Sequence, residues 1–390
     1  MIRVEYPGPS SLFKRRQLLG QKCEAFFREA ILKVDSHCNC SEDWTLHLGS
    51  ALLFDSSGLR ILIESLKNYA GSATSIEFRL RLDPAAHREY YSLGADGDLQ
   101  QIVIPVTASR STVSDGGVEI LEIDFNYSKS LINYPNSLSD AVQMNTPLAL
   151  LMEFHGDFDI LFANQIAIFS ALARNVARSP MAWVRALIRA RPGNWKQRLS
   201  LAYARIHPTA QVHPTAVIEG SVIGPGAKVG AHCVVRYSHI AERVQLSDGA
   251  KVEFSVVGSD SWLMHDLVLL RCHVEDDVFL IHGPYQFSCF HSRSSAFATI
   301  MMDYRPDAKP IKAMTTSGMR GYQGRFLGAV LQEGAKSLAA LLSPGISIPK
   351  ETWLAVDMAS VHAVSRTDLP QQRMLPSSFV NRRTGVDEKV

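Results

Sequence analysis

The sequence is poor in cysteine and has no long apolar run. Its 6 cysteines among 390 residues form no CxxC pair and are too sparse for a disulfide scaffold, which favours reduced thiols. No window of about 18 uncharged apolar residues occurs, and the N-terminal segment MIRVEYPGPSSLFKRRQ has no apolar signal core. We therefore expect a cytoplasmic protein without a membrane span.

Net charge is also nearly absent. With 40 Lys and Arg against 38 Asp and Glu, the chain carries only +2, so no overall field attracts nucleic acid or membrane. Hydrophobic residues make up 46% and charged residues 20%, which is typical of a folded protein. At about 150 residues per domain, this length predicts two to three domains.

One segment departs from this balance, because no acidic residue occurs between Ile160 and Ile218. The same stretch contains the basic residues Arg174, Arg178, Arg185, Arg189, Arg191, Lys196, Arg198 and Arg205. This pattern is consistent with a surface for an acidic partner. The alternative is a solvated basic face on two linker helices, at about 164–190 and 194–204.

A hexapeptide repeat dominates the second half of the chain, where the sequence contains IHPTAQ, VHPTAV, IGPGAK, VGAHCV, LSDGAK and LQEGAK. Aliphatic residues also recur every 17 positions in three columns: Ile206, Ile223, Ile240, Val257 and Val274; Val212, Val229, Leu246, Leu263 and Leu280; and Ile218, Val235, Val252 and Leu269. Three short strands per turn with one inward column each predict a triangular solenoid, whose coils stack about 4.7–4.9 Å apart.

This pattern resembles the left-handed parallel β-helix of hexapeptide-repeat transferases, over about residues 206–282. The resemblance implies a homotrimer. It leaves the chemistry open, because the same solenoid carries acyltransferases, the acetyltransferase halves of sugar nucleotidyltransferases, carbonic anhydrases of the γ class and proteins without a known reaction.

The repeat is unreadable from Gly283 to Arg325 and resumes at Leu331, which predicts a long loop inserted at about 283–326. Basic residues of this loop that we expect to hold phosphates of a donor substrate are Arg305, Lys309, Lys312, Arg320 and Arg325. A solvated loop is the alternative interpretation.

The first half alternates strand-like runs with an amphipathic helix at 58–70, which predicts an α/β domain. Residues 158–164 (FDILFAN) resemble the segment that joins the catalytic domain of sugar-1-phosphate nucleotidyltransferases to a hexapeptide solenoid. The Gly-rich GxGxR loop of those enzymes is missing, so we expect a degenerate domain. The predicted parts are an α/β domain, a basic helical linker, a β-helix and a C-terminal cap with a tail, at 1–157, 158–205, 206–357 and 358–390.

Chemically reactive side chains are densest in IHGPYQFSCFH at 281–291. The resemblance to hexapeptide acyltransferases implies a histidine as general base, for which His282 is the first candidate and His273 the second. Tyr285 is a further catalytic candidate in the same segment, whereas a free cysteine such as Cys289 is more often a small core residue. As an alternative, the aromatic residues of this segment plug the end of the solenoid.

A second candidate site follows from the 17-residue period. Asp248, His265 and His282 occupy one corner on successive coils, so they stack and can converge on zinc or another divalent metal. A plain ladder of exposed histidines is the alternative. The sequence thus predicts acyl transfer from a CoA or carrier thioester to a small-molecule hydroxyl or amine. A metal-dependent hydrolase or lyase and a non-catalytic scaffold or sugar-nucleotide-binding protein remain open.

Overall fold

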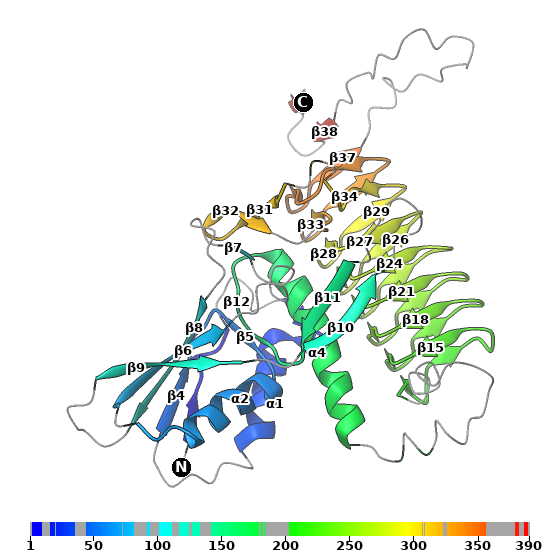
Figure 1. Ribbon diagram of the computed structural model, residues 1–390. Coiled ribbons are helices and arrows are strands. Elements are labelled where there is room, and N and C mark those ends of the chain that lie inside the picture. The colour runs from blue at the N-terminus through cyan, green and yellow to red at the C-terminus, as the bar shows by residue number, and fades with distance from the viewer. Residues whose placement is uncertain are drawn as a thin grey trace, which may run out of the picture.

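The computed structural model contains an α/β domain and a long solenoid that pack side by side, with helix α4 between them (Figure 1). The structure describes residues 2–9, 16–19, 21–35, 44–71, 73–81, 92–93, 101–110, 117–124, 127–132, 142–178, 181, 184, 203–305, 307, 309–322, 326–355, 379–381 and 386–388. In these parts of the chain, no helix combines the length and the apolarity needed to span a bilayer.

The solenoid is a left-handed parallel β-helix with three faces. The first face has the strands β13 (Arg205–Ile206), β16 (Val222–Ile223), β19 (His239–Ile240), β22 (Val256–Val257), β25 (His273–Val274), β28 (Cys289–Phe290), β33 (Val330–Leu331) and β36 (Ser347–Ile348). The second face has β14 (Gln211–Val212), β17 (Lys228–Val229), β20 (Gln245–Leu246), β23 (Trp262–Leu263), β26 (Phe279–Ile281), β29 (Ser295–Phe297), β34 (Lys336–Leu338) and β37 (Trp353–Ala355). The third face has β15 (Val217–Glu219), β18 (Val234–Arg236), β21 (Lys251–Glu253), β24 (Val268–Leu270) and β27 (Pro284–Gln286), and a separate pair continues with β30 (Ile300–Met301) and β35 (Leu341–Leu342).

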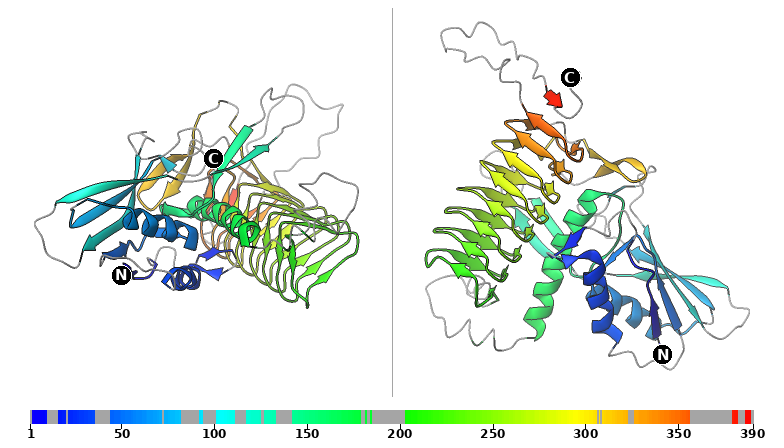
Figure 2. Two further views of the ribbon diagram at one scale, coloured as in Figure 1. Left: turned by 60° about the horizontal axis from the view of Figure 1, so that its bottom comes forward. Right: turned by 180° about the vertical axis from the view of Figure 1, so that it is seen from behind.

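The register of these sheets confirms the 17-residue period. Ile223 pairs with Ile240 and Ile240 with Val257, and each of these side chains is buried inside the solenoid. Because every coil buries its aliphatic column against the coils above and below, the repeat alone supplies a continuous core. Figure 2 shows the regular stack of coils from two further directions.

The solenoid does not stop at Gly283, because one coil is shorter than the rest. Val268 pairs with Pro284 and Val274 with Phe290, a spacing of 16 instead of 17. The turn at Gly283 is tight, since a Cβ there would lie 2.4 Å from the Tyr285 ring. Because this coil is one residue shorter, the aliphatic columns after it no longer fall on the 17-residue period, and the sequence pattern does not show the coil. The excursion therefore covers 302–329, between β30 and β33, instead of 283–326.

This excursion forms a bridge to the α/β domain. It folds into a hairpin of β31 (Ile311–Thr315) and β32 (Gly318–Tyr322), and β32 pairs with β7 (Ser92–Leu93). Ile311, Ala313 and Tyr322 are buried in the same core as the α/β domain. The described part of the excursion is thus tied down on the domain and joins the two halves of the protein.

The α/β domain contains a mixed five-stranded sheet in the order β1-β4-β8-β6-β9. Its strands are β1 (Ile2–Glu5), β4 (Trp44–Leu48), β8 (Gln101–Arg110), β6 (Ser75–Arg81) and β9 (Val118–Ile123), and its helices are α1 (Cys23–Asp35) and α2 (Ser56–Lys67). Smaller antiparallel pairs are β2 (Gln17–Leu18) with β3 (Gln21–Lys22), β5 (Leu52–Phe54) with β12 (Leu151–Glu153), β10 (Tyr127–Ile132) with β11 (Val142–Pro147), and β38 (Phe379–Asn381) with β39 (Val386–Glu388). Only β1 with β4 and β6 with β9 are parallel within the five-stranded sheet.

Helix α4 (Asp157–Arg178) carries the FDILFAN segment and holds the two halves together. Near its start, Asp159 accepts hydrogen bonds from the backbone amides of His155 and Gly156, at 2.7 and 2.8 Å. One turn later, the Asn164 amide group lies 3.1 Å from Nδ1 of His273 on the solenoid and receives the Leu19 amide at 2.7 Å. The polar residues of this segment therefore cap the helix and connect three elements.

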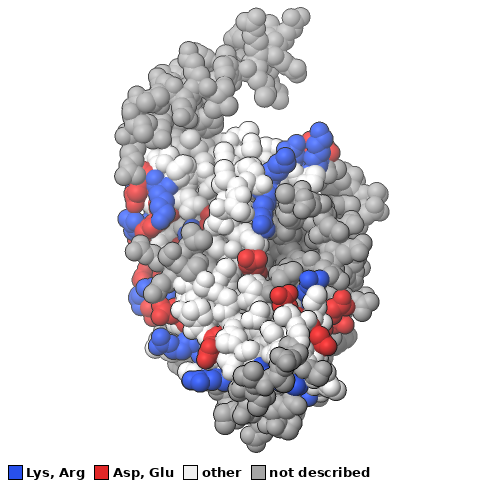
Figure 3. All heavy atoms as spheres, turned by 90° about the vertical axis from the view of Figure 1, so that its left-hand side faces the viewer, with Lys and Arg blue, Asp and Glu red and all other residues white. Residues whose placement is uncertain are grey.

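The second half of the predicted linker lies mostly outside the described residues, including Arg185, Arg189, Arg191, Lys196, Arg198 and the second linker helix up to residue 202. Of the basic residues, Arg174 pairs with the buried Asp55 at 2.8 Å and so fixes α4 to the start of α2. On the described part of the face in Figure 3, acidic and basic side chains are interspersed. Whether the basic linker meets an acidic partner remains a prediction.

Asp159 predicts a pH-dependent stability. Burial raises the pKa of its carboxyl to about 7. The hydrogen bonds from His155, Gly156 and Tyr322 and the charge of Arg320 act in the opposite direction and only partly offset this effect. Because the folded state binds the proton more tightly than the unfolded state, the contribution of Asp159 to stability falls as pH rises from about 4 to about 7. We expect the melting temperature of wild type, relative to Asp159→Asn, to fall over this range. A difference that is constant with pH would contradict this assignment.

Candidate functional site

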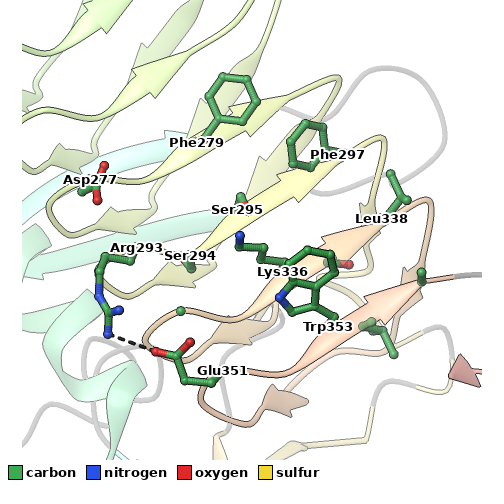
Figure 4. Close-up of a pocket in the computed structure, with 14 residues that line it drawn as sticks. Asp277, Phe279, Arg293, Ser294, Ser295, Phe297, Lys336, Leu338, Glu351 and Trp353 are labelled. Atoms are coloured by element: carbon green, nitrogen blue, oxygen red, sulfur yellow. Dashed lines mark hydrogen bonds and ion pairs between the residues drawn. The ribbon is translucent and has the colours of Figure 1, made fainter. Parts of the chain in front are cut away.

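One candidate ligand site is a groove on the outer surface of the second face, at the C-terminal end of the solenoid. It has a volume of about 750 Å³, within the range of small-molecule sites. Strands β26, β29, β34 and β37 build it, and Figure 4 shows their side chains projecting from the sheet. Because strands alternate their side chains, each inward core residue on these strands is flanked by outward residues that line the groove.

Aromatic side chains form the apolar wall of this groove. The rings of Phe279 and Phe297 lie 5.1 Å apart. Trp262, which does not line the groove, meets Phe279 edge-on at 5.5 Å from the preceding coil. Further along, Trp353 is 47% exposed and Leu338 50% exposed. Large apolar side chains that remain exposed in a groove favour a ligand or a partner chain with an apolar segment.

Charged groups line the other side of the groove. Arg293 is engaged by Glu333 at 2.8 Å and by Glu351 at 3.1 Å, as the dashed line to Glu351 in Figure 4 illustrates. Lys336 differs, because its ammonium group lies over the Trp353 ring at 4.7 Å and forms no ion pair with the described residues. The groove thus offers a cation beside an indole ring, which suits an anionic group on a partly apolar ligand.

His282 lies at the edge of the same face. It directly follows Ile281, whose strand partner Phe297 lines the groove. The shortened turn gives His282 a positive φ of 56° and leaves its side chain exposed. Its ring centroid lies 6.2 Å from that of His265 on the neighbouring coil, as the 17-residue spacing predicts. His282 itself does not line the groove.

The other predicted site residues lie elsewhere. Tyr285 is fully buried in the solenoid interior, where its hydroxyl donates to the Ile281 carbonyl at 3.2 Å, so it packs the core. Asp248 is exposed and accepts the Ala231 amide at 2.7 Å, which stabilises a turn. Its carboxylate does not form a group of close metal ligands with His265 and His282 among the described residues.

The basic residues of the excursion do not reach the groove. Arg305 forms a two-point ion pair with Asp307, at 2.9 and 2.6 Å, and Lys309 and Lys312 are exposed. The positive charge of Arg320 acts to lower the pKa of Glu153, His155 and Asp159. Arg325 lies outside the described residues. None of the four described residues, Arg305, Lys309, Lys312 and Arg320, lines the groove. Their predicted contact with donor phosphates therefore remains a prediction.

A second polar site lies buried between the solenoid and the α/β domain, where His273 projects outward from the first face and is covered by α4. His291 Nε2 lies 3.1 Å from Asp157, and its Nδ1 lies 3.1 Å from Glu275. Burial alone would lower the pKa of His291, but Glu275 and Asp157 together raise it. Burial lowers the pKa of His273, although Glu275 opposes the shift. The sequence interpretation missed this cluster, apart from His273 itself.

An interdomain cavity of about 650 Å³ adjoins this buried cluster. Arg16, Asp157 and Gln332 form its polar wall, while Met314 and Met319 of the hairpin contribute an apolar one. The Arg16 guanidinium donates to Asp157 at 2.7 Å and to Gln332 at 3.2 Å. Only tertiary packing creates this cavity, because its walls come from the α/β domain, the hairpin and the solenoid.

Comparisons with known proteins find only distant similarities to solved structures. No protein-family profile and no curated protein matches the sequence. Among solved structures, a putative acetyltransferase from Bacillus cereus is 15% identical, with 39% of this chain and 72% of that chain covered and a TM-score of 0.22. A hexapeptide transferase family protein from Anaplasma phagocytophilum is 16% identical, with coverages of 42% and 81% and a TM-score of 0.19. An acetyltransferase domain from Neisseria gonorrhoeae, in complex with acetyl coenzyme A, is 20% identical, with coverages of 40% and 55% and a TM-score of 0.13.

These similarities are too low to argue function. The fold assignment rests on the parallel sheets and the 17-residue register of this chain. The resemblance of the α/β domain to a sugar-1-phosphate nucleotidyltransferase is not confirmed.

Proposed function

We propose that this protein is an acyltransferase of the hexapeptide-repeat type, which moves an acyl group from a CoA or carrier thioester to the hydroxyl or amine of a small molecule. One observation supports it most directly. The groove on the second face combines an aromatic wall with the cation of Lys336, which forms no ion pair with any residue that the structure describes, and the exposed His282 lies at the edge of the same face. A thioester donor of this class has an apolar arm and phosphate groups, which match these two features.

In the proposed reaction, His282 acts as general base. Its imidazole takes the proton from the acceptor while the acceptor oxygen or nitrogen bonds to the thioester carbonyl carbon. The tetrahedral intermediate then collapses, the carbon–sulfur bond breaks, and the departing thiolate takes the proton back from the imidazolium. The new ester or amide and the free thiol leave, so no other reactant is consumed.

The groove is open on one side, which the proposed homotrimer would change. In that assembly, a second chain would lie against the exposed apolar residues of the second face, such as Trp262, Leu338 and Trp353. In such a trimer, the basic residues that contact the donor phosphates would belong to the excursion of a neighbouring chain. A trimeric native mass is the expected result of this part of the proposal.

Trp353→Ala tests the groove. We expect it to raise KM for the thioester donor about three- to tenfold, since an aromatic contact contributes about 0.5–1.5 kcal/mol, and to change kcat little. The measurement is steady-state transfer from a panel of acyl-CoA donors, monitored by release of the free thiol. Trp262→Ala is the matched control, because Trp262 is a similarly exposed indole on the same face but does not line the groove. Equal effects of both variants, or no thioester turnover by the wild type, would contradict the proposal.

A further inference from the structure

We propose that His273, Glu275 and His291 bind a divalent transition-metal ion, with Zn²⁺ as the first choice, and that this ion fixes the solenoid to the α/β domain. This inference is independent of the proposed acyl transfer. The site differs from the corner of Asp248, His265 and His282 that the sequence suggested, because it lies on the first face and within a single chain.

The first observation is convergence. One ligand atom from each of the three side chains lies within 4.8 Å of the others, and all three residues are buried. Glu275 Oε1 lies 3.1 Å from His291 Nδ1 and 3.7 Å from His273 Nε2. Two imidazoles and one carboxylate are a ligand set that Zn²⁺ and neighbouring transition ions accept.

The second observation is that these same three atoms lack hydrogen-bond partners. His273 Nε2, Glu275 Oε1 and His291 Nδ1 are all buried, and none forms a hydrogen bond of acceptable geometry, nor does His291 Nε2. The Arg16 guanidinium lies 3.7 Å from Glu275 Oε1. A buried polar atom without a partner costs about 1–3 kcal/mol, so three of them facing one point need an explanation. An ion at that point would satisfy all three.

Surrounding groups contact all three ligands. The amide nitrogen of Asn164, a donor, lies 3.1 Å from the other nitrogen of the His273 ring. Glu275 Oε2 accepts from the amide and hydroxyl of Ser292, at 3.0 and 3.1 Å, and Asp157 lies 3.1 Å from the other nitrogen of His291. A carboxylate beside the non-ligating nitrogen, as Asp157 is for His291, fixes the ring orientation of a ligating histidine.

The position of the site determines its role. All three ligands belong to the solenoid, whereas Asn164 and Asp157 belong to α4. An ion would therefore hold the imidazole rings in the orientation that α4 recognises. His273 and His291 are fully buried, and among the described residues no fourth His, Cys, Asp or Glu joins the group. The interdomain cavity offers the access route, since Asp157 and Arg16 line it with side chains that are 17% and 15% exposed.

The test is metal content and Co²⁺ binding of the full-length protein. We expect about one transition-metal ion per chain as purified, and after chelation an equivalent amount of Co²⁺ that gives visible d–d absorption and raises the melting temperature. These measurements use the wild type, so they do not depend on a variant that folds poorly. Glu275→Gln and His291→Gln should each abolish the Co²⁺ spectrum.

Two controls separate this site from others. His239→Gln changes a histidine in the same outward column of the first face, two coils away, and should retain full metal binding. The double variant His265→Ala/His282→Ala should also retain it. A folded wild type that binds neither Zn²⁺ nor Co²⁺ would overturn the proposal and leave a buried network in which Arg16 and His291 balance two carboxylates. Loss of bound metal in the His265→Ala/His282→Ala variant, but not in the Glu275→Gln or His291→Gln variant, would also overturn the proposal.

Discussion

His282→Ala should lower kcat/KM for acyl transfer by about 10²- to 10⁴-fold, the usual contribution of a general base. The structural reason is placement, because His282 is an exposed histidine that directly follows the strand β26 of the groove. KM for the thioester should change little, since the imidazole does not hold the donor. The measurement is thiol release under saturating donor, with circular dichroism and melting temperature to show that the variant is folded.

His213→Ala is the matched control for this experiment. His213 is also an exposed solenoid histidine that directly follows a strand of the second face, four coils before His282. It should leave transfer unchanged. If His282→Ala retains wild-type turnover, the general-base assignment fails, and the groove would then bind a ligand without His282 taking part in its chemistry.

Tyr285→Ala should destabilise the protein by about 3–5 kcal/mol, because it removes a fully buried aromatic side chain from the solenoid core. The short coil is filled by Tyr285 and Phe290, whose rings meet at 5.2 Å, while the next residue in the column of Leu280 is the small Ala296. Neighbouring coils cannot close such a cavity without breaking register. The expected observable is a large fall in the melting temperature of the solenoid.

Tyr285→Phe distinguishes packing from catalysis. It keeps the ring and removes only the hydroxyl that donates to the Ile281 carbonyl, so we expect about 1 kcal/mol of destabilisation and unchanged acyl transfer. A folded Tyr285→Phe protein with transfer reduced a hundredfold would instead restore Tyr285 as a catalytic residue. Tyr322→Phe, which removes a buried hydroxyl outside the solenoid, provides a comparison for the stability effect.

Most of the solenoid could be predicted from the sequence, because each coil contacts only its neighbours and the code is local. The 17-residue period also placed His265 next to His282 correctly. The same period contains a signal for the groove, which the sequence interpretation missed: Trp262 and Phe279 are 17 apart, as are Lys336 and Trp353, and each pair is in register on the second face. Columns of outward aromatic residues would have indicated this surface.

The single 16-residue coil shows the limit of that code. Removal of one residue at the turn before Pro284 shifts every following position, so Tyr285 seemed to belong to an inserted loop. In the structure, Tyr285 faces the core, and His291 is buried against Asp157 and Glu275. A search for a fixed 17-residue period misses a coil of 16 residues, even when the strands of that coil pair normally.

The sequence by itself determined the β-helix, its three inward columns and the stacking of side chains 17 residues apart, because these depend on contacts between adjacent coils. Only the tertiary structure decided which face of the solenoid is covered. Asp157 meets His291 across 134 positions and Asn164 meets His273 across 109, so no local pattern links them. The buried cluster and the interdomain cavity exist because α4 and the hairpin dock on the first face, and that docking leaves the second face with its aromatic groove open.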